Sequence, residues 1–316
     1  MPATRVIINP NAQHGVTSRL IDAVRGLFAE TDAEVVVTEA PRHATELARE
    51  SAGISRVIAV GGDGTISEVI NGLMGIEQDA RPALGIIPSG SGNDIARLCG
   101  IPTGLSRAFP VLQNGVPRSF DVGICNDRFF FSSFSVGLDA LVVAKTIEYK
   151  ERPHGSGLAL YVRALLSTAF FNLHSIRLII AYDDEPASGH EVILCATTNG
   201  TTYGGGIRIN PWAEPDDGLL ASSVVADIKK LKLLIALPLL AIARQKLLRE
   251  YQGRDCRTVH ISTPDRVPVI AQADGEIFSA ERFEVGILPG ALRVIVPAGH
   301  GAASCDATPV PRGCRS

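Results

Sequence analysis

The sequence predicts an α/β N-terminal domain with a doubly wound parallel sheet, followed by a mainly antiparallel β domain. Over the first hundred residues, strand-like apolar runs alternate with helix-like segments, which is typical of a parallel sheet covered by helices. From Asp121 onward strand-like runs dominate, as they do in antiparallel domains. The length of 316 residues also exceeds the roughly 100–200 residues of one domain. We therefore expect one domain over residues 1–120 and another over residues 121–298.

Four apolar strands are expected in the first domain. They are Arg5–Asn9, Glu34–Thr38, Arg56–Val60 and Leu84–Ile87. The first helix begins near Thr17, a suitable N-cap, and places Leu20, Val24 and Phe28 on one face. Two further helices are expected, one over Arg42–Ser51 and one that carries Ile66, Val69, Ile70, Leu73 and Met74 at helical spacing.

The second domain is predicted from seven strand-like runs and two helical stretches. The strands are Arg128–Phe134, Ser175–Tyr182, Glu191–Thr198, Leu219–Val225, Thr258–Ser262, Val267–Gln272 and Leu292–Val296. The helices are Gly157–Phe171 and Asp227–Tyr251. The tail over residues 299–316 is rich in small and polar residues, and we expect it to be disordered.

Composition excludes several classes of protein. Thirty basic and 33 acidic residues give a formal net charge of −3, which argues against a nucleic-acid-binding protein. None of the six cysteines forms a CxxC pair, so zinc ribbons and thioredoxin-type sites are not expected. Met1–Pro10 lacks the apolar run of a secretory signal, and charges and a proline interrupt the apolar stretch Leu231–Leu248. We expect a cytoplasmic protein, and no pattern sets its oligomeric state.

Two glycine-rich loops follow neighbouring strands of the predicted parallel sheet. Gly61-Gly62-Asp63-Gly64-Thr65 ends the third strand, and Pro88–Asp94 ends the fourth. Ligands bind at this carboxyl edge of an open α/β sheet, where glycines and helix N-termini bring backbone N–H groups close to phosphate oxygens. The alternative is a pair of ordinary strand-to-helix turns. Three glycines around an Asp favour a nucleotide loop, although neither GxxxxGK[ST] nor GxGxxG is present.

Two later acidic segments are also candidates for chemistry. Ala273-Asp274-Gly275-Glu276 follows an apolar strand, so Asp274 is a possible general base; Asp-Gly is equally the commonest hairpin turn. The stretch Thr202–Gly218 is glycine-rich and then acidic. Its Asp216 and Asp217, together with backbone carbonyls, suit a hard divalent cation, and a solvated acidic turn is the alternative.

The order and spacing of these blocks resemble the diacylglycerol-kinase catalytic family, which includes bacterial soluble lipid kinases and the sphingosine and ceramide kinases. The matching blocks are GGDGT, SGSGND, GGG…P.A..DDG.L and DGE, over roughly residues 4–297. Asn9-Pro10 and the block Phe134–Ala140 resemble two further motifs of that family. GGDGT alone is shared with NAD kinases and phosphofructokinases, whereas the four blocks together are specific. The resemblance implies an NAD-kinase-like α/β domain followed by a β-sandwich domain.

The resemblance also implies site residues. Asp274 would be the catalytic base that accepts the proton of a lipid hydroxyl. Asp63, Asp94 and Asp121 would surround a catalytic Mg²⁺. Glu214, Asp217 and Leu219 would hold a second, structural Mg²⁺, Glu214 and Leu219 through their carbonyls. The expected ATP-side residues are Asn9, Thr38, Gly61, Gly62, Asp63, Gly64, Thr65, Ser67, Glu68, Ser91, Asn93, Asp94, Asp121 and Glu276.

The chain departs from the family pattern at three places. Ser91 stands where Thr is usual, and it keeps the hydroxyl. Ser67 stands where Asn is common, which removes one amide. The loop after Asn9-Pro10 is longer before its first glycine, Gly15. None of these changes removes a carboxylate that phosphoryl transfer would need.

The expected function is therefore ATP- and Mg²⁺-dependent phosphorylation of a lipid alcohol, such as diacylglycerol or a sphingoid base, for phospholipid metabolism. The stretch Asp227–Glu250 carries six basic and two acidic residues around apolar ones. It predicts peripheral binding at the inner membrane face, with an ordinary solvated helix as the alternative. Two other functions stay open: an NAD kinase-like phosphotransferase, against which the GGG…DDG and DGE blocks argue, and a non-catalytic nucleotide- or lipid-binding protein.

Overall fold

The computed structural model describes residues 3–10, 18–150, 163–168, 173–202, 204, 206–228, 232, 236, 239 and 242–299. The predicted tail therefore lies outside the described residues except for Gly299, and so does much of both predicted helical stretches of the second domain. The part of the Gly157–Phe171 prediction that is described, residues 163–168, is helical.

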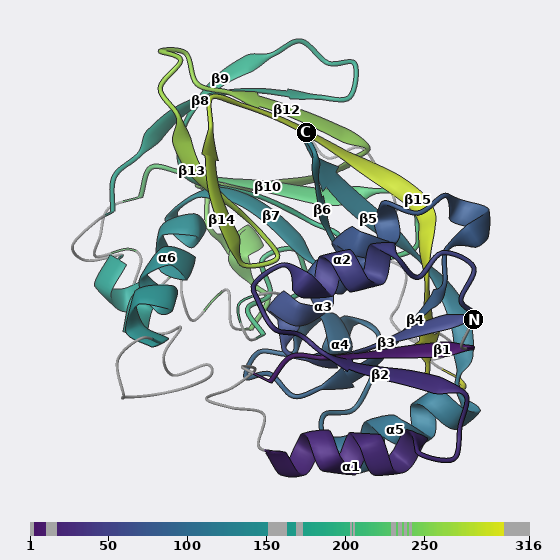
Figure 1. Cartoon of the computed structure of the whole chain (residues 1–316). Coiled ribbons are helices and arrows are strands. Elements are labelled where there is room, and N and C mark those ends of the chain that lie inside the picture. Colours follow the sequence, from purple (N-terminus) through teal and green to yellow (C-terminus); the bar gives the residue numbers. More distant parts are fainter. Residues whose placement is uncertain are drawn as a thin grey trace.

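The first part of the chain is a parallel α/β structure, as predicted (Figure 1). Strands β1 (Thr4–Ile8), β2 (Ala33–Val37), β3 (Arg56–Gly61) and β4 (Ala83–Pro88) lie parallel in the order β4-β3-β1-β2. Helices α2 (His43–Arg49) and α3 (Asp63–Met74) lie on one side of these strands, and α1 (Ser18–Phe28) and α5 (Leu105–Asn114) on the other. All four predicted strands and all three predicted helices are confirmed. The short helix α4 (Asp94–Leu98), α5 and the 3-10 turn η1 (Gln78–Ala80) were not predicted.

Burial explains why these elements form. The two central strands, β1 and β3, are apolar and almost fully buried, because helices cover both faces of the sheet. On one face the rings of Phe28 in α1 and Phe109 in α5 meet edge to face, 5.6 Å apart. The carboxyl ends of β3 and β4 therefore open at one edge of a rigid layer.

The second part is mainly antiparallel, again as predicted. Its strands are β5 (Val116–Cys125), β6 (Arg128–Phe130), β7 (Ser133–Gly137), β8 (Ile176–Tyr182), β9 (Ser188–Thr198), β10 (Leu220–Ala226), β11 (Tyr251–Cys256), β12 (Thr258–Ser262), β13 (Val269–Ala273), β14 (Glu276–Ala280) and β15 (Arg282–Val296). Helix α6 (Leu138–Lys150) follows β7, and a 3-10 turn, η2 (Gln245–Leu247), precedes β11. The predicted boundary between residues 120 and 121 lies within β5.

The second part differs from the sequence prediction in four respects. The predicted strand Arg128–Phe134 is two strands, β6 and β7, with a break at Phe131 and Ser132. Strands β5, β11 and β14 and helix α6 were not predicted. The predicted strand Leu292–Val296 is only the end of the 15-residue strand β15. The predicted helix over Asp227–Tyr251 extends too far, because Gln245–Leu247 is a 3-10 turn and β11 begins at Tyr251.

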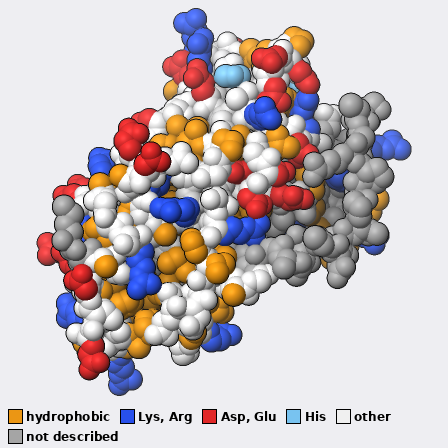
Figure 2. Space-filling model, turned by 90° about the vertical axis from the view of Figure 1, so that its right-hand side faces the viewer, with side chains coloured by type: hydrophobic (Ala, Val, Ile, Leu, Met, Phe, Trp, Pro, Cys, Tyr) orange, Lys and Arg blue, Asp and Glu red, His pale blue; other side chains and the backbone are white. Residues whose placement is uncertain are grey.

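Strand β15 joins the two parts. It pairs antiparallel with β12 and with β5, and its Val294 pairs in parallel with Leu84 of β4. The order β14-β13-β7-β9-β8-β12-β15-β4-β3-β1-β2 is therefore one continuous sheet among the described residues. On the face shown in Figure 2, acidic and basic side chains are interspersed with hydrophobic ones, in keeping with the small net charge.

Candidate active site

The two glycine loops lie side by side at the carboxyl ends of β3 and β4. Gly61 pairs with Pro88, and the amide of Ser89 donates to the carbonyl of Gly61 at 2.8 Å. A methyl group on Gly90 would lie 2.5 Å from Cα of Gly62. These glycines are thus needed for close approach of two backbones, which is the arrangement that also lets N–H groups reach phosphate oxygens.

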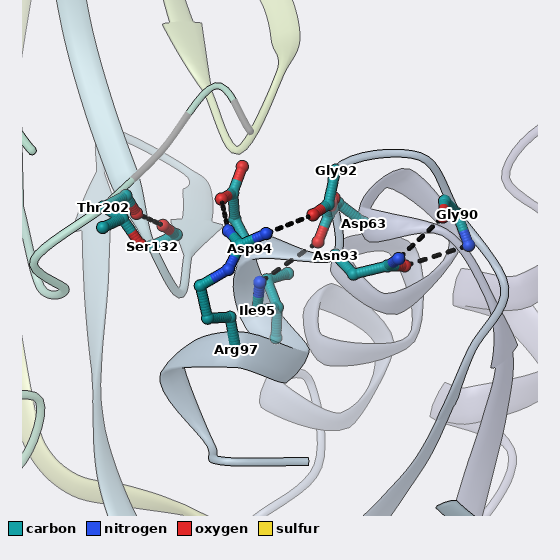
Figure 3. Close-up of polar contacts among 9 residues, drawn as sticks. All are labelled: Asp63, Gly90, Gly92, Asn93, Asp94, Ile95, Arg97, Ser132 and Thr202. Carbon is teal, nitrogen blue, oxygen red and sulfur yellow. Dashed lines mark hydrogen bonds and ion pairs between the residues drawn. The ribbon is translucent and has the colours of Figure 1, made fainter. Parts of the chain in front are cut away.

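Asp63 and Asp94 begin the two helices that follow the loops (Figure 3). The carboxylate of Asp63 accepts the amide of Ile95 at 3.1 Å. The pKa of Asp63 is raised to about 6, first by burial and then by the charge of Asp94, and hydrogen bonds from the backbone at 93–95 partly offset the rise. Asp94 pairs with Arg97 of its own helix, which sequence analysis did not single out. The structure therefore brings these two predicted carboxylates together.

Asn93 shapes the second loop. Its φ is +52°, a left-handed conformation that Asn tolerates, and its side-chain amide both donates to and accepts from the backbone of Gly90, at 2.6 and 2.9 Å. A Cβ on Gly92 would lie 2.8 Å from the Asp63 carboxylate. Ser91 is exposed at the tip of this loop. The side chain of Asn93 thus closes the loop onto its own backbone.

The predicted residues of the first two strands reach the same edge. The side-chain amide of Asn9 donates to the hydroxyl of Thr65 at 2.9 Å, which ties the end of β1 to the first turn of α3. Thr38 is buried after β2, and its amide donates to the carbonyl of Ile8 at 2.8 Å. A Cβ on Gly61 would meet Thr65 at 2.5 Å, so the glycine and Asn9 fix Thr65 together.

Asp274 occupies the β13–β14 hairpin turn with Gly275. Both have positive φ, 46° and 89°, the pattern of the two-residue Asp-Gly hairpin. The carboxylate accepts three consecutive backbone amides, at 2.6 Å from Phe131, 2.9 Å from Ser132 and 3.0 Å from Ser133. The break between β6 and β7 supplies these donors. The Asp-Gly pair is therefore a hairpin turn, as one interpretation expected. The turn also holds the Asp274 carboxylate in a defined position, which is compatible with its predicted role as a base.

The electrostatics of Asp274 link it to the first part of the chain. Burial raises its pKa to about 6 although three amides stabilise the charged form, and the charge of Asp63 raises it as well. The hairpin turn of the antiparallel part therefore carries its carboxylate close enough to the α3 loop for the two charges to interact.

Glu68 and Glu276 form a second pair of acidic groups across the two parts. Burial raises the pKa of Glu68, the charge of Glu276 raises it further, and hydrogen bonds from the backbone of Arg42 and Ala44 lower it. Glu276 faces Arg128 at 3.9 Å, and that guanidinium stacks on Phe278 with 4.7 Å to the ring centroid. Ser67 is buried within α3.

The contacts of Asp121 are with the 214–219 loop rather than with Asp63 and Asp94. Its carboxylate oxygens accept the amides of Gly218 and Gly290, both at 2.7 Å, and its own amide donates to Pro215 at 2.8 Å. The predicted membership of the catalytic Mg²⁺ group therefore gains no support from these contacts. Each carboxylate oxygen of Asp121 holds one backbone turn in place, and its role toward Mg²⁺ stays a prediction.

The 214–219 loop has the donor groups that suit a hard cation. The pKa of Asp217 is raised by burial and then by the charges of Glu214, Asp255 and Asp121, a concentration of negative charge that a cation would relieve. One Asp217 oxygen accepts the amide of Leu219 at 3.0 Å. No three acidic, His or Cys side chains in the described residues cluster as metal ligands, so carbonyl oxygens would have to complete such a site. The other predicted acidic residue of this loop, Asp216, pairs with Arg118.

Several polar residues that organise the site were not predicted from the sequence. Asn199 is fully buried, and its side-chain amide donates to the carbonyls of Asp121 at 2.8 Å and Phe131 at 3.2 Å. Ser132 donates to the carbonyl of Thr202 at 3.2 Å, on the side of the site opposite Asp63 and Asp94 in Figure 3. A lone Asn after an apolar strand offers no pattern from which this role could be read.

The fold and the site together define the class. A parallel α/β part carries paired glycine loops, and an antiparallel part brings an acidic turn to them; this is the architecture of an NAD-kinase-like α/β domain followed by a β-sandwich domain. The family model described as the diacylglycerol kinase catalytic domain matches residues 3–125, and the YegS C-terminal NAD kinase beta sandwich-like domain matches residues 132–296. The chain belongs to this family of lipid kinases.

Individual relatives of the chain carry names from the same family of lipid kinases. A protein of Chromohalobacter salexigens named "Probable lipid kinase YegS-like" is 34% identical over 82% of this chain and 82% of its own length. The diacylglycerol kinase of Mycobacterium tuberculosis is 28% identical over 93% of this chain and 95% of its own length.

Solved structures show the same fold. A Bacillus anthracis str. Sterne protein described as a candidate diacylglycerol kinase is similar, with a TM-score of 0.75, 26% identity, and coverage of 93% of this chain and 94% of that one. An NAD kinase of Archaeoglobus fulgidus, solved with ATP, shares the fold alone, with a TM-score of 0.54, 11% identity, and 94% of each chain covered. Among the described residues, no helix has the length and apolar character needed to cross a membrane.

Proposed function

We propose that the chain transfers the γ-phosphoryl group of ATP to the hydroxyl of a membrane lipid, such as diacylglycerol or a sphingoid base, in a Mg²⁺-dependent reaction. One observation carries the proposal: the carboxylate of Asp274 lies within electrostatic reach of Asp63 although the two come from opposite parts of the chain. This interaction supports a role for Asp274 as proton acceptor next to the loop that carries Asp63.

Asp274 is suited to accept the proton of the attacking hydroxyl. One oxygen, Oδ1, accepts two amides, from Ser132 and Ser133, whereas Oδ2 accepts only that of Phe131. A carboxylate oxygen has two lone pairs, so Oδ2 keeps one for the substrate proton. A pKa of about 6 leaves the group ionised near pH 7 and more basic than an ordinary carboxylate, as general-base catalysis requires.

Residues of the glycine-rich loops and the acidic residues near them would bind and orient the phosphates of ATP. The loop at 61–65 would bind phosphate through backbone N–H groups at the start of α3, where the helix dipole favours negative charge, whereas the amides at the start of α4 already donate to the Asp63 carboxylate. Mg²⁺ held by Asp63 and Asp94 would neutralise charge on the transferring group. A second Mg²⁺ held by Asp217 with the carbonyls of Glu214 and Leu219 would fix the loop that Asp121 anchors.

Peripheral binding to an anionic membrane is part of this proposal. Ile242 and Leu247 are 63% and 67% exposed, and the basic residues Arg244, Lys246 and Arg249 lie near them in the chain. Lys232 is less available, because it pairs with Glu250 at 2.5 Å. We expect Leu247→Glu to reduce sedimentation with vesicles that contain phosphatidylglycerol. Equal sedimentation with purely zwitterionic vesicles would contradict an electrostatic contribution.

The direct test is transfer of radiolabelled phosphate from ATP, with Mg²⁺, to detergent-dispersed lipids. The panel holds diacylglycerol, monoacylglycerol, sphingosine, ceramide, phosphatidylglycerol and undecaprenol, and NAD serves as the non-lipid acceptor. We expect one labelled lipid, and loss of that label in Asp274→Asn. Asp265→Asn, an exposed aspartate of the same part of the chain, is the matched control and should keep activity.

The outcomes separate the competing functions. Label on NAD would show an NAD kinase-like phosphotransferase. ATP binding with no labelled acceptor would favour a binding protein. Full activity of folded Asp274→Asn would exclude Asp274 as the base while leaving the reaction class intact.

A further inference from the structure

A buried polar cluster lies directly beneath the Asp274 turn. Gln272 is the penultimate residue of β13, and its side-chain amide nitrogen lies 3.1 Å from the carboxylate of Asp139 and 3.0 Å from the hydroxyl of Ser135. Ser135 itself donates to Asp139 at 2.7 Å. Gln272, Asp139 and Ser135 are 1%, 3% and 0% exposed, so no solvent competes for these hydrogen bonds. Polar groups at such depth are costly unless they are satisfied.

The cluster is connected to the turn through the other end of the same amide. The side-chain oxygen of Gln272 accepts the amide of Gly275 at 2.8 Å. Gly275 is the second residue of the turn, directly after Asp274, and the amide of Asp274 donates to the carbonyl of Ser133 at 2.9 Å. The backbone on both sides of the Asp274 side chain is therefore held, once by β7 and once by Gln272.

Asp139 determines which way the Gln272 amide points. Oδ2 of Asp139 already accepts the hydroxyl of Ser135, and an acceptor at this position selects the NH₂ end of Gln272 and leaves the oxygen for Gly275. With the amide reversed, the NH₂ group would face the N–H of Gly275, and two donors would meet. The turn could then keep its conformation only by leaving a polar group unpaired.

We propose that Asp139 and Gln272 are positioning residues: Asp139 orients the Gln272 amide, and Gln272 fixes the Asp274–Gly275 turn so that the Asp274 carboxylate stays aligned with its three amides and with the substrate hydroxyl. The inference rests on the proposed function for its catalytic consequence. Its structural part, the restraint on Gly275, does not.

The test is an exchange of partners. Gln272→Glu places two carboxylates side by side, and Asp139→Asn removes the group that selects the amide orientation. In the double variant, the amide introduced at position 139 donates to the carboxylate introduced at 272, whose second oxygen still accepts from Gly275. Misplacing a catalytic group by about 1 Å can cost roughly 100-fold in rate. We therefore expect each single variant to lower kcat by roughly 10- to 100-fold with KM for ATP unchanged, and the double variant to recover to within about tenfold of the wild type.

Gln245→Glu is the matched control for burying a glutamate. Gln245 is 0% exposed and donates to the carbonyls of Arg208 and Ile209, far along the chain from the hairpin. Its loss of stability should not be relieved by Asp139→Asn. A double variant no more active than the weaker single variant would overturn the proposal, as would wild-type kcat in Gln272→Glu.

Hydrogen exchange of the Gly275 amide keeps this test separate from the proposed function. We expect faster exchange in Gln272→Leu, which has no acceptor for Gly275, and wild-type protection in the double variant. If no acceptor lipid is found but this pattern holds, the restraint stands and the lipid kinase assignment fails. Unchanged protection of Gly275 in Gln272→Leu would overturn the restraint whatever the activity.

Discussion

Gly90 and Gly62 face each other so closely that a methyl group on Gly90 would lie 2.5 Å from Cα of Gly62. The two phosphate-type loops therefore share one interface, and neither has its conformation alone. The first loop leads into Asp63 and the second leads into Asp94. The contact between the two glycines therefore sets how far apart the two carboxylates lie.

Gly90→Ala is expected to separate the loops. Overpacking of this kind costs about 1–3 kcal/mol, and here backbone must move rather than a flexible side chain. We expect a lower Tm and a higher KM for ATP, measured by thermal denaturation and initial rates. Gly26→Ala in α1 is the matched control, since nothing lies within 4 Å of its added methyl, and its Tm should not fall. A wild-type KM for Gly90→Ala would show that the loops do not act together on the nucleotide.

Asp63→Asn is expected to raise Tm near neutral pH in the absence of Mg²⁺. The folded-state pKa of Asp63 is about 6, above the usual value of about 3.9, so the folded protein binds the proton more tightly than the unfolded chain. The cost of ionising the buried group is then absent below about pH 4 and complete above about pH 6. The gain in Tm should accordingly be larger at pH 7.5 than at pH 4.5. An equal gain at both values would contradict the raised pKa.

Activity is expected to fall as the pH drops below about 6. Asp274 must be ionised to accept a proton, and its pKa is about 6, as is that of Asp63. We expect kcat/KM to decline between tenfold and 100-fold per pH unit on the acid side, according to whether one or both groups must be ionised. Circular dichroism at pH 5 checks that the fold persists. A pH–rate profile that stays flat down to pH 4.5 would exclude Asp274 as the base.

Mg²⁺ is expected to stabilise the wild type through Asp217. Binding to the folded state alone raises Tm with the concentration of the cation, and it relieves the repulsion among the carboxylates near Asp217. Asp217→Ala should lose the part of this rise that comes from its own site, while Mg²⁺ held by Asp63 and Asp94 would still contribute the remainder. Asp216→Ala is the matched control, because the carboxylate of the adjacent Asp216 pairs with Arg118. The rise in Tm with Mg²⁺ should persist in this variant. The same Mg²⁺ response in both variants would place the cation elsewhere.

Much of the first part followed from the sequence because its pattern is local. Apolar strands such as Arg56–Gly61 are buried on both faces, and the glycines in the loops that follow them predict close contacts between backbones. The sequence singled out Asp63, Asp94 and the Asp274 turn, the last through its Asp-Gly pair and the resemblance to a family. The structure brings the charge of Asp63 within reach of the other two, and their roles stay predictions. Loops that follow adjacent parallel strands lie close together, so the proximity of Asp63 and Asp94 was predictable.

The missed features depend on contacts between distant segments. The apolar run Arg128–Phe134 gives no hint that the chain breaks at Phe131, because the break exists to direct amides toward Asp274, which lies more than 140 residues later. The contacts of Asp121 with Gly218 and Gly290 are equally remote in sequence. The sequence alone does not distinguish an aspartate that accepts backbone amides from one that binds a metal ion.

The course of β15 has a consequence for how the protein is made. The pairing of Val294 with Leu84 spans 210 positions, and Arg81 binds the carbonyl of Ala291 across the same interval. The side of β4 that β15 covers thus stays an open strand edge while a ribosome is still synthesising residues 90–280. Such edges template wrong pairings between chains. Final closure of the α/β part must await the arrival of β15, so nascent chains of this protein are candidates for chaperone protection until synthesis is nearly complete.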